Sequence, residues 1–158
     1  MEYVRRENGG RYDSYRVKSP INSFRDLEVY QKTIQLSNSI TNLPFLNTEE
    51  FAKDREEIKK NAESIPRLIA EAYGDKFDSR ELAHKKLTES ISLVTNMITK
   101  IDLFRQKFLE DRDIKDILDK LLTQYSYQKR KILNLRKAWD RVFGESKEGG
   151  NAKFFPRR

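Results

Sequence analysis

Residues 87–108 read LTESISLVTNMITKIDLFRQKF, and this stretch decides the fold. Its apolar residues recur at steps of four, three, four, three and seven, at Leu87, Ile91, Val94, Ile98, Ile101 and Phe108. Heptad spacing of this kind places the apolar side chains along one side of a helix. Because such a side must be buried against other elements, the stretch predicts a helical bundle.

Three further stretches repeat this periodicity, and they end at Pro44, Gly74 and Gly144. Their apolar seams consist of Leu27, Val29, Tyr30, Ile34, Leu36, Ile40 and Leu43; of Phe51, Ile58, Ala62, Ile65, Ile69 and Ala72; and of Ile114, Leu118, Leu121, Tyr125, Ile132, Leu135, Trp139 and Val142. Gln128 is the one polar residue in the last seam. We expect four helices of about 20 to 32 residues. Short connections make neighbouring helices antiparallel, which gives an all-α, left-handed, up-down-up-down four-helix bundle.

Local signals place the helix ends. Ser23 with Asp26, and Asp78 with Glu81, have the three-residue spacing of a capping box and predict two helix starts. Pro66 falls inside the second helix, where it lacks a backbone donor and predicts a bend.

Composition excludes several classes of protein. The chain of 158 residues is 37% hydrophobic and 36% charged, with six Gly and four Pro, which suits one domain of amphipathic helices better than a sheet. It has no Cys, which excludes disulfides and thiolate sites. Its longest apolar run, residues 68–70, is far shorter than the roughly 20 residues of a membrane span. We therefore expect a soluble, cytoplasmic protein without a membrane partner.

Catalytic and metal motifs are weak. Glu81 and His84 have the spacing used in di-iron bundles, but such a site needs a second pair, and His84 is the single histidine. The sequence has neither a phosphate-binding glycine loop nor a nucleophile elbow. We expect no enzyme activity, no metal and no cofactor.

Positive charge gathers in the last helix and the two tails. The net charge is +7, and residues 129–143 hold six basic residues against Asp140 alone. On a helix, Arg130, Lys137 and Arg141 lie opposite the seam, and Lys129 and Arg136 flank it. Such a row suits RNA or DNA phosphates, because each neutralised charge releases counterions. The alternative is an ordinary solvated face near a helix C-terminus, where cations also stabilise the dipole.

The tails extend this pattern. Residues 1–22 and 144–158 lack a helical period, so we expect a mobile basic N-terminal arm and a mobile C-terminal tail around a domain of residues 23–143. Both tails interleave arginines with aromatic rings, a composition that suits single-stranded nucleic acid and is also common in solvated disorder. Several apolar residues lie off the main seams and offer surface to a partner, including Phe45, Phe77, Phe104 and Leu133.

Three segments resemble a known family. Residues 24–32 (FRDLEVYQK), 64–73 (SIPRLIAEAY) and 133–139 (LNLRKAW) are similar to the opening, the proline signature and the ending of the bacterial four-helix bundle proteins encoded in intervening sequences of large-subunit ribosomal RNA genes. The resemblance covers about residues 22–143. Ala72 stands where glycine is usual, and residues 54–60 are more acidic than usual.

The resemblance implies a bundle that assembles into a ring-like homo-oligomer, such as a pentamer, without catalysis. Relatives of that family are accessory proteins of diversity-generating retroelements, which bind nucleic acid and a reverse transcriptase. The nucleic-acid contact carries over to the last helix alone, at Lys129, Arg130, Arg136, Lys137 and Arg141. We therefore expect a non-enzymatic nucleic-acid or ribonucleoprotein binding module. The competing interpretation is an oligomeric protein-interaction scaffold whose charge only maintains solubility.

Overall fold

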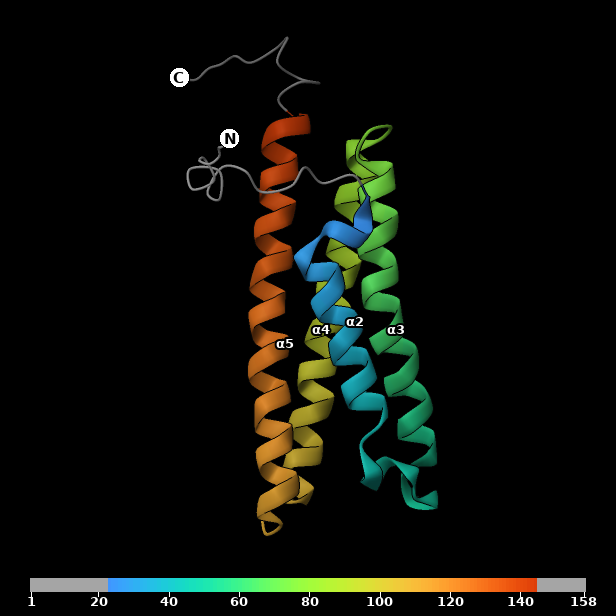
Figure 1. The fold of residues 1–158 in the computed structure, drawn as a ribbon, viewed down its shortest axis with the longest axis vertical. Coiled ribbons are helices and arrows are strands. Elements are labelled where there is room, and N and C mark those ends of the chain that lie inside the picture. Colours follow the sequence, from blue (N-terminus) through green and yellow to red (C-terminus); the bar gives the residue numbers. More distant parts are fainter. Residues whose placement is uncertain (1–22, 145–158) are drawn as a thin grey trace, which may run out of the picture.

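The computed structural model describes residues 23–144, and within them the chain forms four long helices and no strand. The helices are α2 (Glu28–Thr41), α3 (Ala52–Asp75), α4 (Arg80–Lys107) and α5 (Arg112–Trp139). Each runs antiparallel to the one before it, and α5 packs on both α4 and α2, which closes the bundle (Figure 1). The predicted all-α, up-down-up-down four-helix bundle is confirmed. The predicted arm, and the predicted tail after Gly144, lie outside the described residues.

The predicted seams meet in one core, since residues three or four apart share a side of their helix. Its most deeply buried members include Ile40 of α2; Ile58, Ile65 and Ile69 of α3; Leu87, Val94 and Ile101 of α4; and Leu118, Tyr125 and Ile132 of α5. The polar seam residue Gln128 is buried with them. The predicted burial of Val142 in the last seam is wrong, because this residue is 58% exposed. The chain changes from α-helix to the π-helical turn η4 (Asp140–Gly144), and the wider turn takes Val142 out of the seam's register.

Two predicted helix starts need correction. The capping box of Ser23 and Asp26 forms, but it closes the short 3₁₀ helix η1 (Phe24–Asp26), and the extended backbone of Leu27 separates η1 from α2. At α4 the cap is Ser79, whose Oγ accepts a hydrogen bond from the Leu82 N–H at 3.1 Å, instead of the predicted Asp78. Serine caps as well as aspartate does, so a choice between neighbouring residues depends on which one takes the extended conformation.

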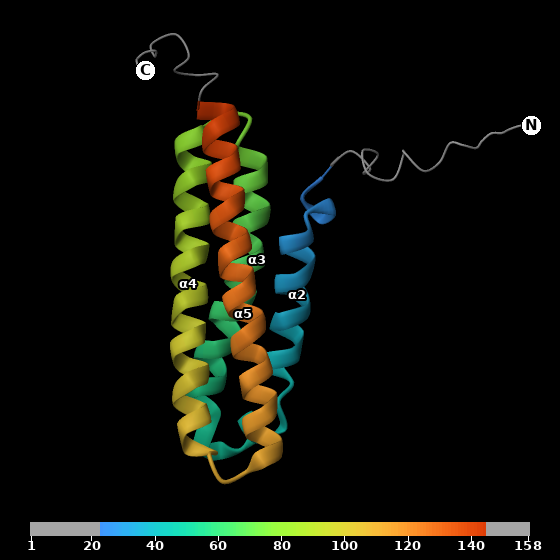
Figure 2. The ribbon, with the colours of Figure 1, turned by 90° about the vertical axis from the view of Figure 1, so that its left-hand side faces the viewer.

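The first helix is shorter than expected. α2 has 14 residues, against 24 in α3 and 28 in α4 and α5, so it spans about 21 Å where α5 spans about 42 Å. The last turns of α5 therefore continue beyond the start of α2 (Figure 2). α3 passes through Pro66 and Gly74 as one helix, and the bend at Pro66 stays a prediction.

Aromatic side chains close the end of the bundle where α2 meets α3. The chain turns there through the 3₁₀ helices η2 (Pro44–Asn47) and η3 (Glu49–Phe51). Phe45 packs against Phe51, Phe104 and Phe108 with ring centroids 4.8 to 5.6 Å apart, and Phe104 is only 3% exposed. The expectation that Phe104 offers surface to a partner is therefore wrong, because Phe45 of η2 packs over it. Phe45 itself is half-buried.

Candidate nucleic-acid interface

The basic face of α5 comprises Lys129, Arg130, Arg136, Lys137 and Arg141. Arg130, Lys137 and Arg141 are exposed, as their positions opposite the seam predict, and Lys129 and Arg136 are half-buried beside the core. The last turns of α5 extend past the residue at which α2 begins (Figure 2). No helix of the described chain covers the basic face along these turns. At 1.5 Å per residue, Arg130 and Lys137 are about 10 Å apart along the helix axis.

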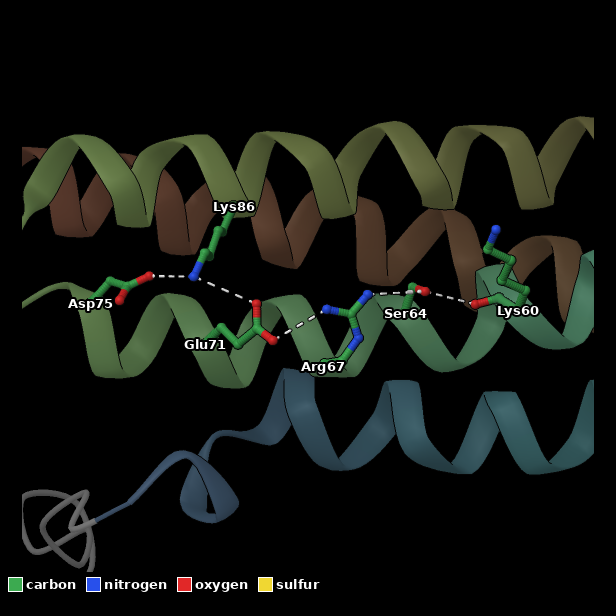
Figure 3. Close-up of polar contacts among 6 residues, drawn as sticks. All are labelled: Lys60, Ser64, Arg67, Glu71, Asp75 and Lys86. Carbon is green, nitrogen blue, oxygen red and sulfur yellow. Dashed lines mark hydrogen bonds and ion pairs between the residues drawn. The ribbon is translucent and has the colours of Figure 1, made fainter.

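Cationic side chains between α3 and α4 form ion pairs with carboxylates of the protein. Figure 3 shows Lys86 of α4 between Asp75 and Glu71 of α3, with Arg67 beside Glu71. The Lys86 ammonium lies 2.8 Å from Asp75 and 3.5 Å from Glu71, and Arg67 lies 3.2 Å from Glu71. The hydrogen bond to Asp75 raises the pKa of Lys86, and the corresponding bond to Glu57 raises the pKa of Lys100. These positive charges are already matched inside the protein.

Asp140 is the one acidic residue within residues 129–142, and its carboxylate points away from the basic face. Within residues 23–142, whose side chains the structure describes, Arg130, Lys137 and Arg141 form no ion pair. Asp140 turns toward α4, where its carboxylate lies 2.9 Å from His84 Nδ1. Arg130, Lys137 and Arg141 are therefore exposed and have no carboxylate partner among the described residues.

Arg136 is bound across the bundle. Its Nη1 donates a hydrogen bond to Thr88 Oγ1 of α4 at 2.8 Å. This contact fixes Arg136 at the edge of the basic face. Of the five predicted residues, the structure brings Arg130, Lys137 and Arg141 together on the open surface and leaves Lys129 and Arg136 at its border.

No family model, curated protein or solved structure matches this chain. None of the described helices has the length and apolar character needed to cross a membrane.

In the described part of the chain, no group of three His, Cys, Asp or Glu side chains could hold a metal ion. His84 makes an interhelical contact with one carboxylate, that of Asp140.

Sequence reasoning missed an aromatic and cationic cluster at the same end of the bundle. The Lys76 ammonium lies 3.6 Å from the ring centroid of Tyr73, 3.5 Å from that of Phe77 and 5.5 Å from that of Trp139. Burial lowers the pKa of Lys76. The cavity beside this cluster is about 10 Å³, which is room for one water molecule and too little for a ligand. Tyr73 lies in α3, Lys76 and Phe77 lie in the turn that follows it, and Trp139 ends α5. Periodicity alone could not bring Trp139 to the other three.

A second missed feature is a groove between α2 and α5, with a volume of about 370 Å³. Its lining is polar rather than basic, and residues from both helices contribute to it. The only sequence signal was Gln128, a polar residue in an apolar seam.

Proposed function

We propose that this protein is a non-enzymatic nucleic-acid or ribonucleoprotein binding module that contacts phosphates through the basic face of α5. The observation that carries the proposal is the exposed row of Arg130, Lys137 and Arg141 without carboxylate partners among the described residues. Charged groups that remain unpaired and exposed keep their full attraction for a polyanion, and neutralising phosphates releases counterions.

The test replaces Arg130, Lys137 and Arg141 together by Gln in the full chain. All three side chains are exposed, so we expect helicity and thermal stability to change little. Affinity for a fluorescent mixed-sequence RNA or DNA should fall for every sequence. The slope of log K against log salt should flatten by roughly 0.7 to 0.9 for each lost contact.

A matched control removes the same charge from another side of the bundle. Lys53, Lys59 and Lys60 are exposed on α3, and Glu56 and Glu63 lie one turn from the last two. Their triple change to Gln lowers the net charge equally and leaves both tails intact. It should reduce affinity much less than the α5 triple. Equal losses in the two variants, or no retention of nucleic acid by the wild type at about 50 mM salt, would contradict the proposal.

We also propose self-association, on the basis of apolar side chains that remain exposed around the α4–α5 turn. Leu103 is 55% exposed, and Leu109 and Ile117 are also large and exposed. The family resemblance implies a homo-oligomer such as a pentamer. Light scattering after size exclusion should then give a multiple of 18.8 kDa, and a monomer at micromolar concentration would refute it.

An oligomeric scaffold without a nucleic-acid role is the second candidate, and these exposed apolar residues favour it equally. It predicts assembly together with no salt-dependent affinity for RNA or DNA. A reverse transcriptase partner, which the resemblance also implies, is tested by co-purification of the two proteins from one expression strain.

A further inference from the structure

Figure 2 shows α2 and α5, the first and last long helices, side by side. Residues of both helices line the groove between them. Its residues are Lys32, Gln35, Leu36 and Ser39 of α2 with Thr123, Gln124, Tyr127 and Gln128 of α5. Three of the eight are glutamines and none carries a carboxylate. The lining therefore offers amide donors and acceptors with one cation, a composition suited to a polar and neutral group.

Gln128 gives this groove an unused hydrogen-bonding group. Its side chain is only 5% exposed, and its Oε1 is buried without a hydrogen-bond partner among the described residues. A buried acceptor left unpaired costs free energy, so a ligand that donates to the amide would recover that cost. Rotation about the last side-chain bond exchanges Nε2 and Oε1, which lets the same amide meet a donor or an acceptor.

Tyr127 adds an aromatic surface at the rim. Its side chain is 49% exposed, and the Lys131 ammonium lies 5.3 Å from the ring centroid. A second depression of about 370 Å³, lined by Leu122, Thr123, Ser126, Tyr127 and Arg130, shares Thr123 and Tyr127 with the groove. The groove and this depression therefore adjoin at Tyr127, and Arg130 of the basic face lines the depression.

We propose that this groove holds an unpaired base of a single-stranded nucleic acid whose phosphates lie on the basic face of α5. The base stacks on Tyr127, its edge hydrogen-bonds to the amide of Gln128, and the neighbouring phosphate contacts Arg130. The proposal rests on the proposed function and adds a strand preference to it. A base within a duplex is paired and stacked on its neighbours, so only an unpaired base can enter.

Charge and chemistry favour this occupant. Aromatic side chains stack on bases of any sequence, and glutamine amides match the paired donor and acceptor groups of a base edge. Within the described chain, no carboxylate lines the groove or the adjoining depression, and Lys32, Arg130 and Lys131 surround them.

The test compares two fluorescent single strands of about 12 nucleotides that carry the same phosphates, oligothymidylate and an abasic strand of equal length. We expect the wild-type full chain to bind oligothymidylate roughly tenfold more tightly, within the range of about 5- to 150-fold given by one aromatic stack. Tyr127→Ala should abolish this preference without changing affinity for the abasic strand, and Tyr127→Phe should retain it. Gln128→Met, which removes the amide and keeps the side-chain length, should reduce the preference in a protein of unchanged helicity.

The outcomes separate the two proposals. Equal binding of both strands by the wild type, or a preference that survives Tyr127→Ala, overturns the base site and leaves phosphate binding standing. A preference unchanged by Gln128→Met overturns the role of the amide. If neither strand binds at about 50 mM salt, the proposed function fails together with this inference.

Discussion

Replacing Tyr125 by Phe is expected to stabilise the bundle, although Tyr125 is part of its core. The side chain of Tyr125 is completely buried, and its hydroxyl has no hydrogen-bond partner among the described residues. Folding therefore takes this hydroxyl out of water without replacing its hydrogen bonds. Phenylalanine keeps the ring and removes only the oxygen.

The expected gain follows from two opposing terms. A buried, unpaired polar group costs about 1 to 3 kcal/mol. The void left by the oxygen, roughly 10 to 15 Å³, costs about 0.3 kcal/mol. We therefore expect the free energy of unfolding of Tyr125→Phe to rise by about 0.7 to 2.7 kcal/mol at pH 7, measured by urea denaturation followed by circular dichroism. The melting temperature should rise by roughly 3 to 5 °C for each kcal/mol.

The difference should widen at alkaline pH. Burial raises the pKa of Tyr125 above its ordinary value of 10.0. Above pH 10 the unfolded chain then releases a proton that the folded chain retains, so the wild type loses up to about 1.4 kcal/mol of stability per pH unit from this group. Phenylalanine has no such proton. Measurements at pH 7 and pH 11 isolate the effect, because all other titrating groups are common to both proteins.

Two results would refute this reasoning. A loss of more than about 1 kcal/mol at pH 7 would mean that the hydroxyl is hydrogen-bonded in solution. A stability difference that stays constant between pH 7 and pH 11 would mean that Tyr125 ionises as readily in the folded chain as in the unfolded one.

Three further predictions concern the helix ends and the core. Ser79→Ala should cost about 1 kcal/mol in urea unfolding, because it removes the cap on the Leu82 N–H, whereas Asp78→Ala should be nearly neutral; the reverse order would contradict the cap. Phe104→Ala should lower the unfolding free energy by about 3 to 5 kcal/mol, because it removes a buried ring from the aromatic cluster. A loss below about 1 kcal/mol would show that the cluster does not persist in solution. Pro66→Ala should change the unfolding free energy by less than about 1 kcal/mol, because a regained backbone hydrogen bond offsets the lost ring burial; a larger loss would show that the proline ring itself holds the packing.

The sequence alone determined the helices and most of the core. Spacings of three and four are a local property of each segment, and they identify the buried side of a helix before any partner is known. For the same reason, the positions of Arg130, Lys137 and Arg141 opposite the seam could be derived from residue numbers, and the structure leaves all three exposed. The start of α4 could not be derived in this way. Ser79 and Asp78 are both good caps, and the cap is the one that adopts the extended backbone, Ser79.

Tertiary structure decided what each surface faces. The short α2 leaves the end of α5 uncovered, and the fold of η2 buries Phe104 beneath Phe45. The pairing of Asp140 with His84, and the groove that joins Tyr127 to α2, bring together residues far apart in the chain. Helical periodicity describes a segment only relative to its own axis. The neighbours of an exposed or unpaired group depend on the lengths and relative placement of different helices, and these are set only when the helices pack.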